Sequence, residues 1–417
     1  MFILCACGTL QQKKTFAFIR VFFFSSAFYF SMTSPKMPYW RLSGFYWFYF
    51  ASLGIVVPFW SLYLNSLGFD AKSIGELMAI LMATKIVAPY LWSWIADHTG
   101  HCMKIIRIAS ICSSIAFLGV FINSSFWWLA LVMLLFSFFW NATLPQFEAN
   151  TMNYLGDDTH KYSVVRLWGS LGFVFSVVVI GFLLDEVGYQ LVPISIFILY
   201  VCITVFSFLV SDAPQKVLHT NHKSILNVIK KPHVIALLAV CFLMQVSHAP
   251  YYTFYSLYLK QFDYSSATLG WLWALGVMAE VILFMFMHKL MPKYSTKFLL
   301  IIALFLTTVR WLLIGSYVEN FPVIIFAQCL HAASFGLYHA VAIELFHKNF
   351  KGKLQGRGQA LYSALSFGAG GALGTVLSGV FWDVYSPQII FSAAAGASFI
   401  ALLITLKFSS LEVKVEH

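Results

Sequence analysis

A single carboxylate lies near the middle of a long apolar stretch of this sequence. The stretch runs from Thr268 to Met287, and its twenty residues are enough for a helix to cross a bilayer core of roughly 30 Å. Glu280 is its one charged residue. A carboxylate at that depth costs about 2.5–3.5 kcal/mol even on mild insertion scales, so it normally faces water, a partner or a solute. Such a group can also take up and release a proton as its surroundings change, which makes Glu280 a candidate for proton coupling.

An internal repeat places a cation at the position that corresponds to Glu280. The string SLYL starts at Ser61 and again at Ser256, and the same offset of 195 residues carries Lys85 onto Glu280. Parallel repeats related by an axis normal to the membrane bring equivalent positions face to face. We therefore predict that Lys85 and Glu280 look into one central cavity and sense each other there. The alternative is that the Lys85 side chain extends to the membrane surface.

Other polar groups also lie in apolar segments. Arg310 lies in mid-span, where an arginine rarely faces lipid, and a cavity or ion-pair role is expected for it. Glu148 ends one segment and Arg166 opens the next, which predicts a substrate-binding pair or a structural pair at a loop. Two helical stripes carry further candidates, on the spacing that places residues on one helix face: Gln328, His331, Phe335 and His339; and His248, Tyr251, Tyr252 and Tyr255. A lone histidine in such a stripe is as often a packing group as a ligand.

The chemistry that these groups suit is movement of a solute rather than bond making. No segment shows a nucleophile elbow, a zinc signature or a glycine-rich phosphate loop, so neither a metal nor a cofactor is predicted. Gly368–Gly374 lies within an apolar segment and is typical of close helix packing. Cysteine spacing offers no metal site, and the cysteines from Cys102 onward are interpreted as small core residues rather than disulfides or ligands.

The elements that position these groups are long apolar helices. Hydrophobic residues make up 60% of the 417 residues and charged residues 10%, whereas soluble domains carry about 25% charged residues. Mean hydropathy is +0.81. From Tyr39 we count twelve segments, and a polar break divides them into two sets of six. The predicted parts are an N-terminal extension (1–36), a first six-helix bundle (37–211), a cytoplasmic linker (212–233) and a second six-helix bundle (234–417).

The basic residues predict the orientation of these helices. If both ends are cytoplasmic, nineteen of the 26 Lys and Arg residues lie inside and two outside. This asymmetry follows the positive-inside rule and favours cytoplasmic termini. It also accounts for the net charge of +10 as membrane topology, so we predict no nucleic-acid partner. Residues 1–36 contain no acidic residue and no cleavage site, and are interpreted as an upstream start with Met37 as the true first residue; an interfacial arm is the alternative.

Several strings together resemble the major facilitator superfamily, and specifically its phenylpropionate permease family, relatives of the lactose-permease-like sugar–proton symporters. The likeness covers Trp40 to about Phe408. The strings are QFEA (Gln146–Ala149), YSVVRLWGSLGF (Tyr162–Phe173), HAPYY (His248–Tyr252), WALGVMAEV (Trp273–Val281), VRW (Val309–Trp311) and QCLH (Gln328–His331). The resemblance implies an all-α membrane fold of two pseudo-symmetric six-helix bundles, with alternating access to a site at the midplane.

The resemblance also implies roles for particular residues. Glu148 and Arg166 match the pair that holds substrate in the sugar symporters. Glu280, Arg310 and His331 match that family's acid, arginine and histidine on the eighth, ninth and tenth spans. Gln328 stands where the sugar symporters carry a lysine, and the expected substrate-binding set also includes His248 and Tyr252. Their proton-bearing glutamate is here Ser334, so Glu280 or Glu148 becomes the expected proton carrier.

A cytoplasmic loop signature of the superfamily is present in altered form. Its pattern GxxxDRxGR appears as Ser93–His101, with Asp97 and Gly100 kept and both arginines replaced by His98 and His101. The resemblance implies that Asp97 latches the two halves of the protein. Because histidine changes charge near neutral pH, the replacement predicts a pH-sensitive latch.

The expected function is that of a monomeric, proton-coupled symporter for a small organic solute in a bacterial inner (plasma) membrane. An aromatic carboxylate is favoured, because Arg310 would bind the carboxylate and the aromatic residues would stack on its ring. The alternatives are a sugar or nucleoside symporter and a non-transporting sensor with the same architecture. The expected partners are the solute, the proton and the lipid bilayer.

Overall fold

A computed structural model describes residues 37–156, 158, 161–213 and 225–408. The predicted extension (1–36) and residues 214–224 of the predicted linker (212–233) lie outside these residues, and so does the side chain of Asp97. Contacts between Cα atoms divide the chain into one unit that ends at Tyr39 and a second that begins at Trp40. The description below concerns the second unit.

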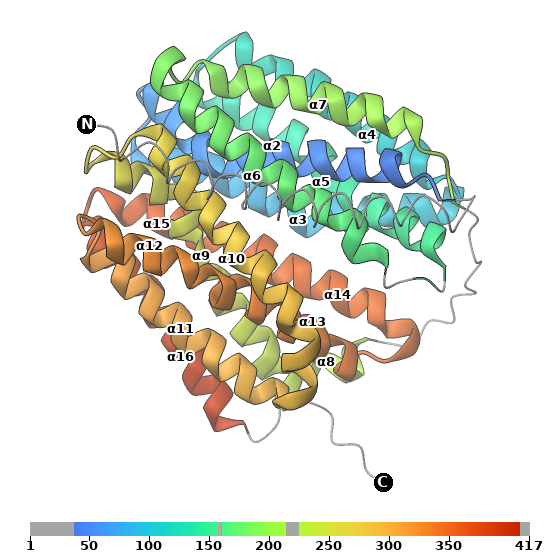
Figure 1. Ribbon diagram of the computed structural model, residues 1–417. Coiled ribbons are helices and arrows are strands. Elements are labelled where there is room, and N and C mark those ends of the chain that lie inside the picture. The colour runs from blue at the N-terminus through green and yellow to red at the C-terminus, as the bar shows by residue number, and fades with distance from the viewer. Residues whose placement is uncertain (1–36, 157, 159–160, 214–224, 409–417) are drawn as a thin grey trace, which may run out of the picture. The chain divides into compact units, whose positions relative to one another are not determined.

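The prediction of twelve membrane-spanning helices is confirmed: twelve helices of the described chain are long and apolar enough to cross a bilayer. The first six lie together, coloured blue to green in Figure 1. They are α2 (Tyr39–Ser66), α3 (Ala71–Thr99), α4 (Cys102–Phe117) continued by η2 (Leu118–Phe121), α5 (Phe126–Leu155), α6 (Tyr162–Val187) and α7 (Leu191–Leu209). Their buried faces form the core of the first half, and their outer faces carry exposed apolar side chains suited to lipid.

The last six spans form the second half, and two of them are interrupted. A short α8 (Leu226–Ile229) precedes them. The spans are α9 (Pro232–Lys260), α10 (Ser266–Lys293), α11 (Thr296–Ser316), α12 (Phe321–Cys329) with η4 (Ala332–Leu337) and α13 (Tyr338–Asn349), α14 (Gln355–Ser363) with η6 (Ala364–Gly370) and α15 (Gly371–Trp382), and α16 (Pro387–Lys407); η5 (Gly352–Leu354) opens the eleventh span. Both η4 and η6 are π-helical turns. Such turns inside α-helices are frequent at functional sites.

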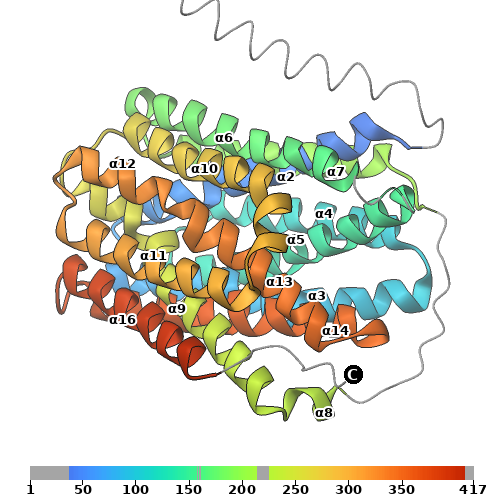
Figure 2. The same cartoon turned by 60° about the horizontal axis from the view of Figure 1, so that its bottom comes forward.

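Glycines bring the two halves into backbone contact at two places. A Cβ atom on Gly75 of α3 would lie 2.8 Å from the Gly379 Cα of α15, and one on Gly270 of α10 would lie 2.5 Å from the Val177 carbonyl oxygen of α6. Gly181 of α6 also packs on Gly270. Figure 2 shows α6 and α10 side by side over this contact. Small residues allow this close approach of helices in a membrane, and the 195-residue offset of the repeat relates Gly75 to Gly270.

The helix starts beside these contacts are capped in different ways. The Asp70 carboxylate accepts a hydrogen bond from the backbone N–H of Ser73 (2.9 Å) in its own helix, α3. The start of α10 is capped locally by Ser265 and also from the other half, since Asp185 of α6 accepts from the N–H groups of Ser266 (2.8 Å) and Ala267 (2.9 Å). Helix starts attract carboxylates because their first N–H groups lack helical partners. Asp185 therefore ties α6 to α10.

Candidate functional site

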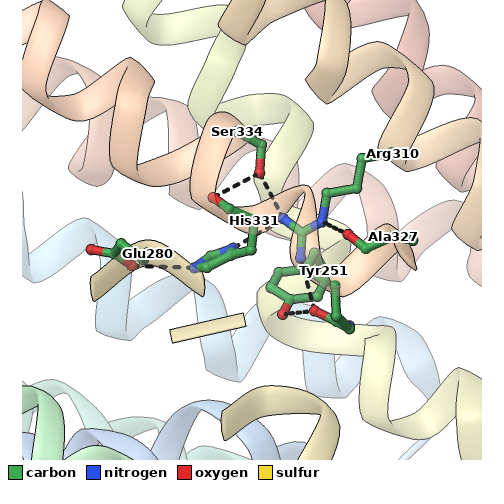
Figure 3. Close-up of polar contacts among 7 residues, drawn as sticks. Tyr251, Glu280, Arg310, Ala327, His331 and Ser334 are labelled. Carbon is green, nitrogen blue, oxygen red and sulfur yellow. Dashed lines mark hydrogen bonds and ion pairs between the residues drawn. The ribbon is translucent and has the colours of Figure 1, made fainter. Parts of the chain in front are cut away.

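Arg310 is the centre of a buried polar network in the second half. Its side chain is fully buried. Nε donates to the Ala327 carbonyl (3.0 Å), Nη2 to Oε1 of Gln328 (3.1 Å), and Nη1 to both Oγ of Ser334 (2.8 Å) and Nδ1 of His331 (3.1 Å). Figure 3 shows these contacts converging on the guanidinium. Four acceptors from the tenth span therefore hold one cation from the ninth, which satisfies most of its five donors.

Aromatic rings and a turn of irregular helix complete this enclosure. The guanidinium carbon lies 4.2 Å from the Tyr251 ring centre and 4.7 Å from that of Trp311, distances typical of cation–π contacts. Tyr251 also donates its hydroxyl to Oε1 of Gln328 (3.0 Å). The π-helical turn η4 begins directly after His331, at the point where the span must present several side chains to Arg310. No part of the guanidinium is accessible, so the expectation that Arg310 itself meets a solute carboxylate is not supported by this arrangement.

The contact with Arg310 determines which ring nitrogen of His331 carries the proton. A guanidinium has donors and no acceptor, so Nδ1 of His331 must accept and the ring proton must reside on Nε2. Nε2 lies 3.6 Å from Oε2 of Glu280, a distance of electrostatic contact rather than of a hydrogen bond. The result is a row in which a neutral imidazole separates the buried Arg310 cation from the Glu280 carboxyl group (Figure 3).

Small residues allow Glu280 to approach this row. A Cβ atom on Gly336 of η4 would lie 3.0 Å from Cγ of Glu280. One turn before Glu280 on α10, Gly276 packs against the His331 side chain, where a Cβ would lie 3.4 Å away. The Glu280 side chain keeps 16% of its surface exposed, against 7% for His331. Water thus reaches Glu280 but hardly reaches the imidazole behind it.

The first half holds a second acid–base pair, which is more open. Nε of Arg166 lies 3.8 Å from Oε1 of Glu148, and the two side chains are 29% and 37% exposed. Tyr162 donates its hydroxyl to the same carboxylate (3.1 Å). The Arg166 guanidinium stacks over the Phe50 ring at 3.7 Å. Among the described residues, no hydrogen-bond acceptor engages Nη1 or Nη2 of Arg166, so these nitrogens are available to a ligand.

The two sets of charges lie near one another across the halves of the protein. Glu280 interacts electrostatically with Arg166 and with His339, and His339 interacts with Arg166 and Glu280. Arg166 of α6 is therefore a common neighbour of Glu148 in its own half and of two groups in the other half. The structure brings together Glu148, Arg166, Glu280, Arg310, Gln328 and His331, as the sequence predicts.

Two predicted residues of α9, His248 and Tyr252, lie beside the Arg310 network and interact electrostatically with Arg310, whereas Lys85 lies apart from Glu280. His248 is fully buried inside the second half, where its ring packs edge-on against Trp311 at 4.9 Å and its Nδ1 contacts the Met244 carbonyl (2.8 Å). Tyr252 lies one turn further, with its ring 6.4 Å from that of Trp273. Lys85 contacts the sulfur of Met82 (3.7 Å). No described contact or charge interaction joins Lys85 to Glu280, so the structure does not bring this predicted pair together.

The predicted latch is only partly described. Gly100 ends α3 in the left-handed region at φ 69° and donates its N–H to the Ala96 carbonyl (2.9 Å), a conformation that glycine adopts without strain. The Asp97 side chain lies outside the described part of the chain, so its role as a latch stays a prediction.

The sequence reasoning missed Phe50 and Tyr162; the signal for Tyr162 was its place one helical turn before Arg166.

Two six-helix halves that enclose a row of charged groups within membrane spans define a membrane transporter of the major facilitator type. The chain belongs to the MFS_1 like family, whose model matches residues 39–393. It is 28% identical over 344 residues to a probable 3-phenylpropionic acid transporter of Escherichia coli, covering 81% of this chain and 89% of the relative. It is 24% identical to a putative nucleoside transporter of the same organism, covering 78% and 80%. A crystal structure of a mutant of the nucleoside transporter NupG has the same fold, with TM-score 0.80, 16% identity and coverage of 88% and 98%.

Proposed function

We propose that the protein is a proton-coupled symporter for a small organic anion, with an aromatic carboxylate such as a phenylpropionate favoured. The observation that carries this proposal is the difference between its two arginines. Arg310 is buried and engaged by four acceptors, whereas Arg166 is 29% exposed and has both terminal nitrogens available. A guanidinium with two parallel N–H donors matches a carboxylate in a bidentate pair.

The surroundings of Arg166 favour an aromatic solute. Phe50 is half-buried beneath the guanidinium, and its ring lies where the apolar part of a bound carboxylate would extend. Aromatic pairs add about 0.5–1.5 kcal/mol beyond the area that they bury. The similarity to a probable 3-phenylpropionic acid transporter supports the same class of solute.

Glu280 is the proposed proton carrier. Its carboxyl group is mostly buried, is partly reached by water and faces a neutral imidazole rather than a fixed cation. Symport of one proton with a monocarboxylate moves no net charge, so the pH difference across the membrane is the driving force. Each pH unit supplies about 1.36 kcal/mol per proton, which supports about tenfold accumulation.

The proposed setting is a bacterial inner membrane, with both termini in the cytoplasm, in accordance with the distribution of basic residues. The protein would act there as a monomer, with the solute and the proton as its ligands. In this orientation the glycine contacts and Asp185 lie at the outer end of the helices, and α13 ends at the inner face.

A hydroxylated solute, such as a nucleoside or sugar, is the second candidate. The Glu148 carboxylate is 37% exposed and accepts from one hydroxyl already, that of Tyr162, so it is suited to accept from the hydroxyls of a ribose or hexose. The similarity to a putative nucleoside transporter supports this candidate.

The test is uptake of radiolabelled 3-phenylpropionate by proteoliposomes under an imposed proton gradient. Under a difference of about one pH unit we expect wild type to accumulate the acid about tenfold, and Glu280→Gln to reduce the accumulation ratio to about one. Glu344→Gln is the matched control, because Glu344 is 40% exposed and pairs only with Lys348 (3.6 Å) among the described ion pairs. Uptake that is indifferent to the gradient would refute coupling. Inhibition by uridine or maltose, with no uptake of the acid, would favour the second candidate, and binding without uptake would favour a sensor.

A further inference from the structure

A second histidine lies two helical turns beyond His331 on the same span. The rings of His331 and Phe335 are parallel within 1° with centroids 5.5 Å apart, and those of Phe335 and His339 are parallel within 6° at 5.6 Å. The π-helical turn η4 lies between the two histidines and keeps all three rings on one face. His339 interacts electrostatically with Glu280, as His331 does by direct approach. Two imidazoles, those of His331 and His339, therefore interact with Glu280.

The two imidazoles differ in the partner of Nδ1. In His331 that partner is the Arg310 guanidinium at 3.1 Å, which only donates. A proton on Nδ1 of His331 would point at an N–H group of Arg310, and two donors cannot form a hydrogen bond. His331 therefore cannot become an imidazolium while this contact lasts. In His339 the partner is the hydroxyl of Tyr362 at 3.0 Å. A hydroxyl oxygen accepts from an Nδ1–H group, in the neutral ring and in the imidazolium alike, so Nε2 of the neutral His339 ring carries no proton and is able to gain one.

We propose that His339 is the group that accepts the proton from Glu280 and delivers it to the side of the membrane where α13 ends. This inference rests on the proposed proton symport and adds a second proton-binding residue to it. His331 then acts as a positioning residue, which stays neutral and separates Glu280 from Arg310. The assignment follows from hydrogen-bonding capacity, since only one of the two rings is free to gain a proton.

The proton moves from Glu280 to water in two steps. In the first, the O–H bond of protonated Glu280 breaks and, through one water molecule, an N–H bond forms at Nε2 of His339. The Glu280 group becomes a carboxylate and the His339 ring an imidazolium, whose Nδ1–H donates to the Tyr362 oxygen. In the second, Nε2 gives a proton to water and the ring returns to its neutral form. Among the described residues no hydrogen bond occupies Nε2 of His339, and the side chain is only half-buried.

Three charged or titratable groups face His339 from other helices. Glu280 faces it from α10, Arg166 from α6 and Tyr362 from α14. Two apolar rings, Phe335 of η4 and Phe367 of η6, also pack against the His339 ring. Arg166 opposes a positive ring, although Glu148 at 3.8 Å compensates part of its charge. A bound solute carboxylate at Arg166 would remove that repulsion, which links solute binding to proton transfer.

The test compares net uptake with exchange in proteoliposomes, with 3-phenylpropionate as the probe. Net uptake under a proton gradient requires release of a proton inside, whereas exchange of labelled for unlabelled acid at equal pH does not. His339→Gln keeps a donor for Tyr362 but cannot carry a proton. We expect it to lower net uptake at least about tenfold and to leave exchange within about twofold of wild type.

Two further variants make the outcome decisive. His288→Gln on α10 is the matched control, because His288 is exposed, and we expect wild-type values for it. Tyr362→Phe removes the acceptor for the imidazolium, and we expect a smaller loss of net uptake with an altered pH profile. Wild-type net uptake in His339→Gln, or equal loss of uptake and exchange, would overturn the role of His339. Gradient-independent uptake by wild type would instead overturn the proposed symport.

Discussion

Each half of the protein contains one central arginine and one central carboxylate, but the halves arrange them in opposite ways. In the first half Arg166 and Glu148 approach within 3.8 Å and both remain about one-third exposed. In the second half His331 separates Arg310 from Glu280, and the arginine is fully buried. The exposed ion pair of the first half is accessible to a ligand. In the second half the arginine and the carboxyl group are separated, and the arginine is shielded from water. The comparison supports the proposal that the first half binds the solute and the second half handles the proton.

Exchanging each arginine for glutamine tests this division, and Arg310→Gln has the largest expected effect. The change leaves the Ala327 carbonyl, Ser334 and Gln328 in a buried site without their common donor. Removing one member of a buried charged network costs about 3–5 kcal/mol. We expect a large fall in the thermal unfolding temperature of the detergent-purified variant, or no folded protein, whatever ligand is added.

Arg166→Gln is the matched change in the first half, and its expected effect is on binding rather than stability. Exposed ion pairs contribute about 0–1 kcal/mol, so its unfolding temperature should stay close to that of wild type. A charge-assisted hydrogen bond to a carboxylate is worth about 1.5–3 kcal/mol, which corresponds to about 10- to 150-fold weaker binding. Calorimetry with 3-phenylpropionate measures this loss. Equal losses of stability in the two variants would contradict the division.

The sequence predicted the architecture well because the membrane imposes it. Continuous apolar runs of about twenty residues permit only helices, so their number and order follow from the sequence alone. Glu280 and Arg310 were found by the same reasoning, since a charge in such a run needs a partner. The exposure of Arg310 was harder to predict, because one of the acceptors that enclose it, Ser334, lies in the π-helical turn after His331. A prediction from residue spacing assumes a regular α-helix, so it does not reveal that turn.

Lys85 shows the limit of reasoning from the repeat. The 195-residue offset relates Gly75 to Gly270 in fact, since both lie at contacts between the halves. The same offset relates Lys85 to Glu280 in sequence, yet the described side chains do not meet. Pseudo-symmetry places backbones at equivalent positions, but the surrounding side chains differ, and those decide where a long and flexible lysine extends.

The glycine contacts allow an intermediate effect to be predicted. In Gly270→Leu the new side chain must enter a space where even a Cβ lies 2.5 Å from the Val177 carbonyl oxygen. Overpacking of this kind costs about 1–3 kcal/mol, and here it opposes only the contact between α6 and α10. We expect amides at the start of α10 to exchange with deuterium about 5- to 150-fold faster, as measured by mass spectrometry. Gly396→Leu is the control, because no atom lies within 4 Å of its Cβ position, and equal acceleration in both variants would contradict the interpretation.

The smallest expected effects come from removing the carboxylates that cap the starts of α3 and α10. Loss of such a cap costs about 1 kcal/mol. Asp70→Ala removes a cap within α3, whereas Asp185→Ala removes one that joins the halves. We therefore expect similar small losses of stability, with faster amide exchange in α3 alone for Asp70→Ala and at both α6 and α10 for Asp185→Ala.

The Asp70 cap also has a defined dependence on pH. Hydrogen bonds from Ser73 hold the pKa of the Asp70 carboxyl below its ordinary value. The cap therefore contributes in full above the ordinary pKa and is lost as the pH falls through the lower value of the folded protein. The stability difference between wild type and Asp70→Ala should be constant near neutral pH and shrink only in acid. A difference that grew on acidification would show that the carboxylate is not the stabilising form, and Asp70 would then be no model for the cap that Asp185 provides between the halves.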